Sequence, residues 1–211
     1  MAKLPRKKHK IDISAILHKL DVAPSLLLNV GVGQKPHNEA EQFKEWFPDI
    51  EIIGFEPQII TFVQRVDDYQ GRLYPFGLHK ADQLLSLLLT KDQGNTSLLE
   101  PKKRLKVVGD GVQLAPFYTL DTFARVVPIS RKSFLWMDIE GSELNVLKGG
   151  VRTLRSGCIK WVLVEVSKLP RRCGEPSEKS LSSVLSLYGF SKWFEFDETK
   201  EFKNVIFKLG G

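Results

Sequence analysis

The sequence predicts an α/β fold with a mainly parallel sheet, and short apolar runs carry the prediction. Residues 26–30 and 51–55 are apolar over the length of one strand and flank a helical segment at 38–47. This order of strand, helix and strand is the βαβ unit, in which the two strands lie parallel. Further runs at 134–138 and 161–166 extend the sheet, and their continuous apolar character suits strands covered on both faces.

The remaining elements follow from periodicity and from turn residues. Residues 1–10 are a basic tail and 11–20 an amphipathic lead-in helix, so we divide the chain into residues 1–25 and one domain at 26–211. Beyond the βαβ unit we expect a helix from Pro57 to about Tyr69, a strand at 73–76, helices at 142–154 and 179–188, and a terminal hairpin of strands 191–196 and 203–208.

Residues 81–119 break the alternation of strands and helices. The run 84–89 fits either a strand or a buried helix, whereas 107–108 and 112–118 look like strands around an Asp110-Gly111 turn. We interpret this segment as a small, mostly β insertion.

Composition bounds the class of protein. The chain has 211 residues, of which 42% are hydrophobic and 27% charged, and this suits one soluble domain. No apolar stretch approaches the ~18 residues of a membrane helix. The two cysteines make neither a disulfide framework nor a metal cluster. Because the basic amino terminus is not followed by an apolar signal region, we expect a cytoplasmic protein.

The net charge of +6 is concentrated in basic clusters within residues 1–10, at 102–106 and at Arg171-Arg172. Such clusters bind nucleic acid or membrane surfaces in some proteins and are solvated loops in others. Aromatic residues do not interleave with them as they do in a platform for single strands. We therefore rank nucleic acid below a smaller substrate.

The first strand ends in Gly31 and Gly33, and the second ends in Glu56. Glycines let the backbone turn sharply and approach a ligand, and a carboxylate at the end of the next strand accepts hydrogen bonds from ribose hydroxyls. Pro36 stands where a dinucleotide fingerprint has its third glycine, and the P-loop spacing is absent. S-adenosylmethionine (SAM), an adenosine compound without phosphates, fits best. An ordinary strand-to-helix turn is the alternative for the two glycines.

Several motifs follow one another along the chain. They are Asn29-Val30-Gly31-Val32-Gly33, Gly54-Phe55-Glu56-Pro57, Asn95-Thr96-Ser97-Leu98, Thr119-Leu120-Asp121, Asp138-Ile139-Glu140-Gly141-Ser142-Glu143 with Leu147-Lys148-Gly149, and Val164-Glu165-Val166. Together they resemble the FkbM family of SAM-dependent methyltransferases over residues 26–196. The resemblance implies the class I methyltransferase (Rossmann-like) sheet of seven mostly parallel strands with the last strand antiparallel. It also implies methyl transfer, usually to an oxygen of a sugar or natural product.

The resemblance assigns roles to residues of this chain. It places Glu56 on the ribose, Gly31 and Gly33 at the methionine part of SAM, and Gly77 and Leu78 at the adenine. The full set of implied cofactor-binding residues is Asn29, Gly31, Val32, Gly33, Glu56, Pro57, Gln58, Gly77, Leu78 and Asp138. Substrate contacts are expected from Asn95, Ser97 and Glu143, although an Asn/Ser-rich turn is the alternative for the first two.

Methyl transfer requires donor and acceptor to be held in line, and a hydroxyl acceptor must also lose its proton to a base or a metal-assisted group. Asp138 ends the strand at 134–138, Glu140 follows it closely, and Glu165 ends the next strand, all in the crevice where α/β sheets bind ligands. We predict these three as catalytic residues without a metal, and a magnesium site is the alternative use of such carboxylates. Glu143 also fits the first turn of a helix.

Three functions follow, in this order. The first is O-methylation of a hydroxyl on a sugar, glycan or natural-product small molecule. The second is methylation of nucleic acid, RNA in particular, with the basic tail and the 102–106 cluster as its binding surface. The third is a non-catalytic adenosine-binding module, suggested by Asn29 where the family commonly has Asp.

Overall fold

The computed structural model describes residues 14–34, 39–90, 96–102, 109–129, 132–196, 199 and 201–210. The strands are Leu26–Val30 (β1), Glu51–Phe55 (β2), Arg72–Tyr74 (β3), Gly77–Leu78 (β4), Gln83–Thr90 (β5), Gly109–Tyr118 (β6), Ser133–Met137 (β7), Ile159–Ser167 (β8), Phe190–Phe196 (β9) and Phe202–Leu209 (β10). The helices are Ser14–Leu17 (α1), Glu39–Trp46 (α2), Ile59–Arg65 (α3), Leu120–Val126 (α4), Glu143–Gly149 (α5), Val151–Arg155 (α6) and Glu178–Ser186 (α7).

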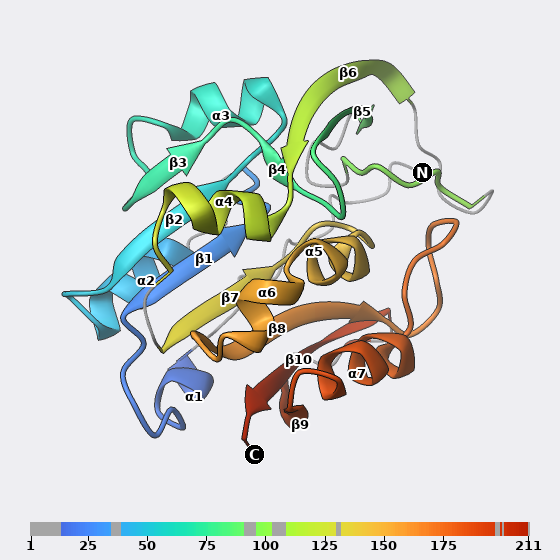
Figure 1. Cartoon of the computed structure of the whole chain (residues 1–211). Coiled ribbons are helices and arrows are strands. Elements are labelled where there is room, and N and C mark those ends of the chain that lie inside the picture. Colours follow the sequence, from blue (N-terminus) through green and yellow to red (C-terminus); the bar gives the residue numbers. More distant parts are fainter. Residues whose placement is uncertain are drawn as a thin grey trace, which may run out of the picture.

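Seven strands form the main sheet, in the order β3-β2-β1-β7-β8-β10-β9 (Figure 1). β1 pairs in parallel with β2 and β7, and the parallel pairing continues to β3 on one side and β8 on the other. β10, the last strand of the chain, lies antiparallel between β8 and β9. The predicted sheet of seven mostly parallel strands with an antiparallel last strand is confirmed.

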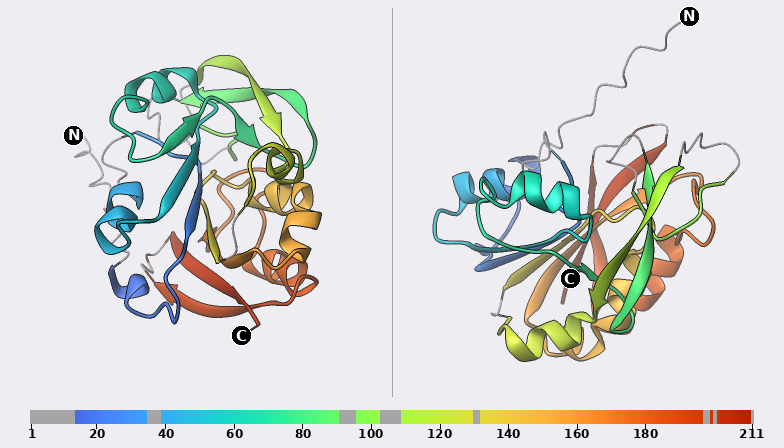
Figure 2. Two further views of the ribbon diagram at one scale, coloured as in Figure 1. Left: turned by 60° about the vertical axis from the view of Figure 1, so that its left-hand side comes forward. Right: turned by 90° about the horizontal axis from the view of Figure 1, so that it is seen from above.

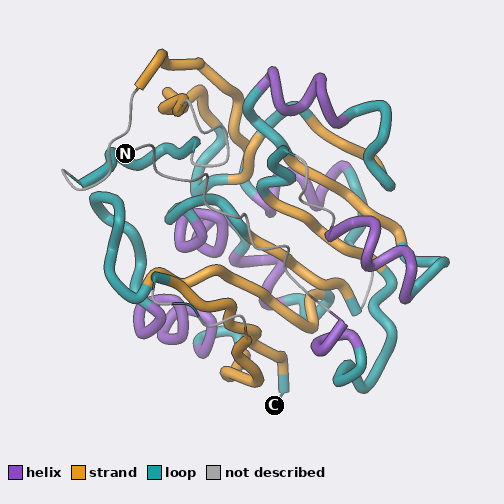
Figure 3. Tube along the Cα trace, turned by 180° about the vertical axis from the view of Figure 1, so that it is seen from behind, coloured by secondary structure: helices purple, strands orange, loops and turns teal. Residues whose placement is uncertain are grey.

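The sheet is buried on both faces, as the unbroken apolar runs predicted. Leu26, Leu28 and Val30 face one core cluster, to which α4, α5, α6 and α7 contribute, whereas Leu27 faces a second cluster with residues of α1 and α2. The sheet is a layer between helices in the left view of Figure 2, and Figure 3 shows the same layers from behind. Since both faces are covered, a ligand site is expected at the ends of the strands.

Within the predicted β insertion at 81–119, β5 and β6 pair with each other, and together with β4 they form a three-stranded sheet in the order β4-β6-β5 (Figure 1). The predicted strand at 107–108 lies outside the described residues. The run 84–89 is a strand, since it lies within β5 and pairs antiparallel with β6. The predicted Asp110-Gly111 turn is wrong, because both residues lie inside β6, where Gly111 pairs with Leu89. The long pairing with β5 continues the strand through a dipeptide that favours turns.

The helix predicted at 142–154 is divided into α5 and α6 at Gly150. Gly150 leaves helical geometry, with φ −114° and ψ 24°, and a Cβ on it would lie 2.8 Å from Cδ2 of Leu120 in α4. The first turn of α6 is capped by a residue of another helix. Asp121 of α4 accepts hydrogen bonds from the backbone N–H groups of Arg152 (2.9 Å) and Thr153 (2.8 Å). The sequence did not predict α4, whose Thr119 cap accepts from the N–H of Thr122 (2.9 Å).

Within the described ranges, no helix has both the length and the apolar character needed to cross a membrane. The basic tail at 1–10 and all of the 102–106 cluster except Lys102 lie outside the described residues.

Candidate active site

The carboxyl ends of β1, β2 and β7 meet at one edge of the main sheet. The N–H of Gly31 donates to the carbonyl oxygen of Phe55 (3.0 Å), and the N–H of Asp138 donates to that of Val30 (3.1 Å). Residues that directly follow three neighbouring strands therefore lie side by side.

The turn after β1 requires glycine. Gly31 has φ +85° and Gly33 has φ +64°, both in the left-handed region. A Cβ on Gly31 would also lie 2.2 Å from the carbonyl oxygen of Asp138. The absence of a side chain thus lets the loop after β1 pack directly on the end of β7.

Glu56 binds this glycine loop. Its side chain is buried; Oε2 accepts from the N–H of Gly33 (2.9 Å), and Oε1 accepts from the N–H of Gln58 (2.9 Å). A carboxylate has about four acceptor positions, so these two bonds fix its orientation and leave it able to accept from hydroxyl groups. The glycine loop and the predicted ribose-binding acid are therefore one unit.

Arg65 of α3 supports the loop from the other side. Its side chain is 2% exposed and donates from Nη1 to the carbonyl oxygen of Gly33 (3.4 Å). The guanidinium also forms ion pairs with Glu41 of α2 (3.6 Å) and with Asp68 (3.5 Å). One buried arginine thus joins the glycine loop to both neighbouring helices.

Gln113 of β6 holds the turn that follows Glu56. Its Nε2 donates to the carbonyl oxygen of Pro57 (2.7 Å), and its Oε1 accepts from the N–H of Ile59 (3.1 Å). The small sheet is therefore fastened to the start of α3.

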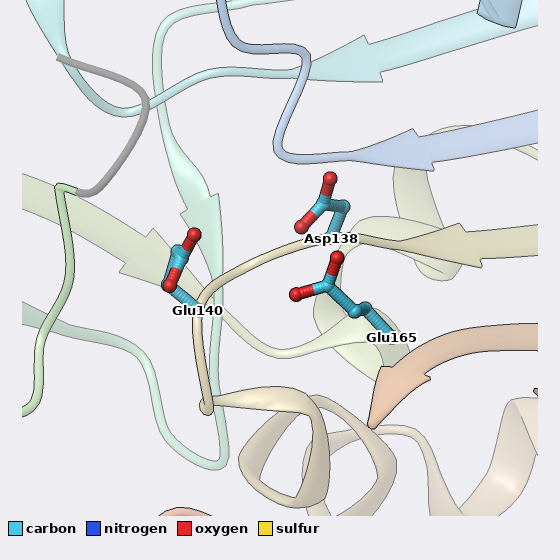
Figure 4. A group of neighbouring side chains, drawn as sticks. All are labelled: Asp138, Glu140 and Glu165. Carbon is cyan, nitrogen blue, oxygen red and sulfur yellow. The ribbon is translucent and has the colours of Figure 1, made fainter. Parts of the chain in front are cut away.

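Three carboxylates lie together beside the glycine loop that contains Gly31 and Gly33 (Figure 4). Asp138 follows β7, Glu165 lies near the end of β8, and Glu140 lies on the turn before α5. One oxygen of each lies within 4.8 Å of the others. Glu140 has φ +53°, a left-handed backbone uncommon in residues other than glycine. This turn brings its side chain back toward the strand ends.

Two arginines place positive charge beside the three carboxylates. Nη2 of Arg171 lies 3.0 Å from Oε1 of Glu165 and 3.4 Å from Oε2 of Glu140. Nε of Arg172 lies 3.6 Å from the same Glu140 oxygen. The interpretation of Arg171-Arg172 as a basic surface cluster is thus corrected: both arginines pair with acidic groups, and Arg172 is buried.

Burial is the largest cause of the raised carboxyl pKa values in this region. It raises the pKa of Glu140, of Glu143, which reaches about 7, and of Glu165. The negative charge of Asp138 raises all three further, whereas Arg171 lowers the pKa of Glu140 and Glu165. Repulsion between close carboxylates favours a proton held within the group at neutral pH.

The family model described as the methyltransferase FkbM domain matches residues 27–198, most of the chain. The chain belongs to the FkbM methyltransferase family. It is a SAM-dependent methyltransferase. No curated protein sequence matches the chain.

The chain is also similar to solved structures. Magnesium protoporphyrin IX methyltransferase (ChlM) from Synechocystis PCC 6803 with bound SAM is 9% identical, with a TM-score of 0.50 over 94% of this chain and 78% of that chain. A methyltransferase from Pyrococcus furiosus is 13% identical, with a TM-score of 0.43 over 93% and 81%. OxaC in complex with SAH and oxaline is 12% identical, with a TM-score of 0.45 over 92% and 44%, so this chain spans under half of its length.

In this FkbM methyltransferase two loops, residues 97–102 and 171–175, lie beside the carboxylate cluster. Ser97 Oγ donates to the carbonyl oxygen of Glu140 (3.0 Å), which brings this predicted substrate residue to the cluster. The loops are joined by bonds from the N–H of Lys102 to the Arg171 carbonyl (2.9 Å) and from the N–H of Cys173 to the Glu100 carbonyl (2.8 Å). Nη1 of Arg172 adds a bond to the Leu99 carbonyl (3.3 Å).

Glu143 and Asn95 are the other predicted substrate residues. Glu143 is 2% exposed at the start of α5 and accepts from the N–H of Gly141 (3.2 Å), as expected for a carboxylate in a first turn. Asn95 is outside the described residues.

Four predicted cofactor-binding residues make other contacts in the structure. The Asn29 amide donates to the hydroxyl of buried Tyr69 (3.3 Å), on the sheet face opposite Val30. Val32 is buried in the second core cluster. Gly77 and Leu78 form β4, where they pair with β6.

Sequence reasoning missed the roles of Arg65, Arg171 and Gln113 beside the site. A signal existed for Arg171: three acidic residues predicted to share one crevice need a cation, and a pair of arginines follows Glu165 by six residues. Nothing in the pattern of α3 or β6 marked Arg65 or Gln113.

Proposed function

We propose that this methyltransferase transfers the SAM methyl group to a hydroxyl oxygen of a neutral acceptor, either a sugar, a glycan or a natural-product small molecule. The observation that carries the proposal is the contact of Gly31 with Asp138, because it joins the loop held by Glu56 to the carboxylate cluster. A donor bound on the first and an acceptor bound beside the second would meet at this contact.

On the cofactor side, we assign the ribose hydroxyls to Glu56 and the methionine part of SAM to Gly31 and Gly33. The bonds from Gly33 and Gln58 hold the Glu56 carboxylate in one orientation before any ligand binds, which lowers the entropy cost of binding. SAM carries a positive sulfonium, and the nearby carboxylates favour it electrostatically.

On the acceptor side, we assign the base to Asp138. Glu140 is paired with two arginines. The raised pKa of Glu165 keeps that carboxyl group protonated at neutral pH, so it cannot accept a further proton. The acceptor oxygen gives its proton to the Asp138 carboxylate as the new carbon–oxygen bond forms and the carbon–sulfur bond breaks. S-adenosylhomocysteine and the methyl ether leave.

The charge of the cluster supports a neutral acceptor. Three carboxylates with two guanidinium groups leave no excess positive charge, so the cluster does not attract a phosphate backbone or a carboxylate acceptor. Arg171 and Arg172, the third basic cluster of the sequence, are used within the protein.

The test uses SAM with a tritiated methyl group and an extract of the source cells, separated into small molecules, glycans, protein and nucleic acid. We expect label in small molecules or glycans, stable to alkali as a methyl ether is, and absent with the Asp138→Asn variant. Label removed by nuclease would instead establish a nucleic-acid methyltransferase. SAM binding with no labelled product would favour the non-catalytic module.

A further inference from the structure

We propose that the guanidinium group of Arg171 is the built-in cation of the carboxylate cluster and takes the position that a divalent metal ion would otherwise occupy. The inference rests on the proposed active site, but its test measures ion binding and does not depend on methyl transfer.

The position of the guanidinium is the first argument. The oxygens of Asp138, Glu140 and Glu165 within 4.8 Å of one another match the ligand set of a hard cation. Such an ion sits about 2.0–2.6 Å from each oxygen and so must lie between them. Nη2 of Arg171 lies 3.0 Å and 3.4 Å from the two glutamates, the distances of a nitrogen cation shared by both.

The arginine is anchored at several points. Its Nε donates to Oγ of Ser167 (3.2 Å), and its backbone N–H donates to Oε2 of Glu175 (2.6 Å). Its carbonyl oxygen accepts from the N–H of Lys102 (2.9 Å), and its guanidinium lies over the ring of Phe202. A side chain held in this way on both its backbone and its head group is part of the site and is not a loosely placed surface charge.

Charge balance is the second argument. Arg171 and Arg172 place two positive charges against three carboxylates, and Glu175 is occupied by the N–H groups of both arginines (2.6 and 3.0 Å). With one proton held by the cluster, the charges of these three carboxylates and two guanidinium groups cancel without a metal. Adding a divalent ion would place two positive charges beside the half-buried guanidinium of Arg171, which is unfavourable.

Manganese(II) tests the inference directly, since its binding is read by the loss of the free-ion electron paramagnetic resonance signal. At pH 8 we expect the wild type to bind no Mn²⁺ in the micromolar range. Arg171→Met should create one site, with an affinity at least tenfold higher than that of the wild type, and Arg171→Lys should not. The double variant Arg171→Met with Glu165→Gln should lose the new site.

Arg152→Met is the matched control, because this arginine is largely exposed and pairs with Asp121 away from the cluster. It should leave Mn²⁺ binding unchanged. Stoichiometric Mn²⁺ binding by the wild type would overturn the inference, and that measurement stands even if Arg171→Met fails to fold. A folded Arg171→Met variant that binds no more Mn²⁺ than the wild type would overturn it as well.

Discussion

The α-carbon of Gly31 packs so closely on the backbone of Asp138 that a Cβ at residue 31 would lie 2.2 Å from the Asp138 carbonyl oxygen. The contact joins the loop after β1 to the end of β7, so the cofactor half and the acceptor half of the proposed site share one backbone contact. Any atom added there must push the two halves apart.

Gly31→Ala should therefore be more harmful than an ordinary glycine replacement. Gly157→Ala is the control, since Gly157 also has a positive φ (+71°) but an added Cβ would lie 3.7 Å from Cδ2 of Leu209, an ordinary contact. We expect the control to lose about 1–2 kcal/mol of unfolding free energy from the left-handed backbone alone. Gly31→Ala should lose about 1–3 kcal/mol more through overlap, and bind SAM at least tenfold more weakly. Equal losses in chemical denaturation would contradict this.

Glu56→Gln keeps the shape of the side chain but removes the charge that the ribose hydroxyls are proposed to meet. Hydrogen bonds to charged groups contribute about 1.5–3 kcal/mol, so the dissociation constant for SAM should rise by about 10- to 100-fold. Glu51→Gln on the same strand is the control, because Glu51 is half-exposed and pairs with Arg72. If calorimetry gave both variants the wild-type affinity for SAM, Glu56 would not be a SAM-binding residue.

Arg65→Lys should distinguish the effect of the positive charge at residue 65 from the effect of the guanidinium geometry. Lysine keeps the positive charge near Glu41 and Asp68 but lacks the planar fork that also reaches the Gly33 carbonyl. We expect a folded protein whose affinity for SAM falls severalfold, whereas Arg72→Lys on the surface should change neither property. A drop in melting temperature with unchanged SAM affinity would make Arg65 only a structural residue.

Asp138→Asn and Glu165→Gln should differ sharply in activity. Loss of a general base typically costs about 10²–10⁴-fold in rate, which we expect for Asp138→Asn with SAM binding retained. Glu165→Gln should keep most of the activity, because a carboxyl group whose pKa is raised by burial resembles the amide at neutral pH. The reverse order of activities, measured as label transferred from tritiated SAM, would move the base to Glu165.

Stability should fall as the pH rises through the titration of Glu143. Burial raises the pKa of this carboxyl from 4.5 to about 7, so the folded protein holds the proton more tightly than the unfolded chain does. The stabilisation is complete below pH 4.5 and is lost as the pH rises to about 7. By linkage the loss is about 3 kcal/mol.

Glu143→Gln cannot release a proton and should lack this loss. Its unfolding free energy relative to the wild type should therefore increase between pH 4.5 and pH 8, as measured by urea denaturation. Glu45→Gln, at an exposed position of α2, should follow the wild type across the range. A constant difference between Glu143→Gln and the wild type would show that Glu143 does not titrate in this window.

The main sheet was predictable because its strands have local signatures. The apolar runs at 26–30 and 51–55 coincide with β1 and β2, since a strand buried on both faces tolerates few polar residues. The failures have tertiary causes. Gly150, where the predicted helix divides, packs closely on Leu120 of α4, and Asp110-Gly111 stays extended because β5 pairs beyond it.

The site was predictable only in part, for a related reason. Glycines and carboxylates at strand ends follow from the sheet itself, and the glycine loop, Glu56 and the three carboxylates were all expected near its edge. The orientation of Asn29 follows from alternation along β1, which the sequence argument did not apply to a buried strand. Arg171 reaches the cluster from a loop, and loop conformation has no periodic signal.

The hydrogen bonds between residues 97–102 and 171–175 have a consequence for the divergence of related enzymes. An insertion or deletion in one loop would remove hydrogen-bond partners from the backbone of the other loop and would also shift Arg171. The two segments are therefore expected to change length together among homologues, so that a new acceptor preference arises through paired rather than single alterations.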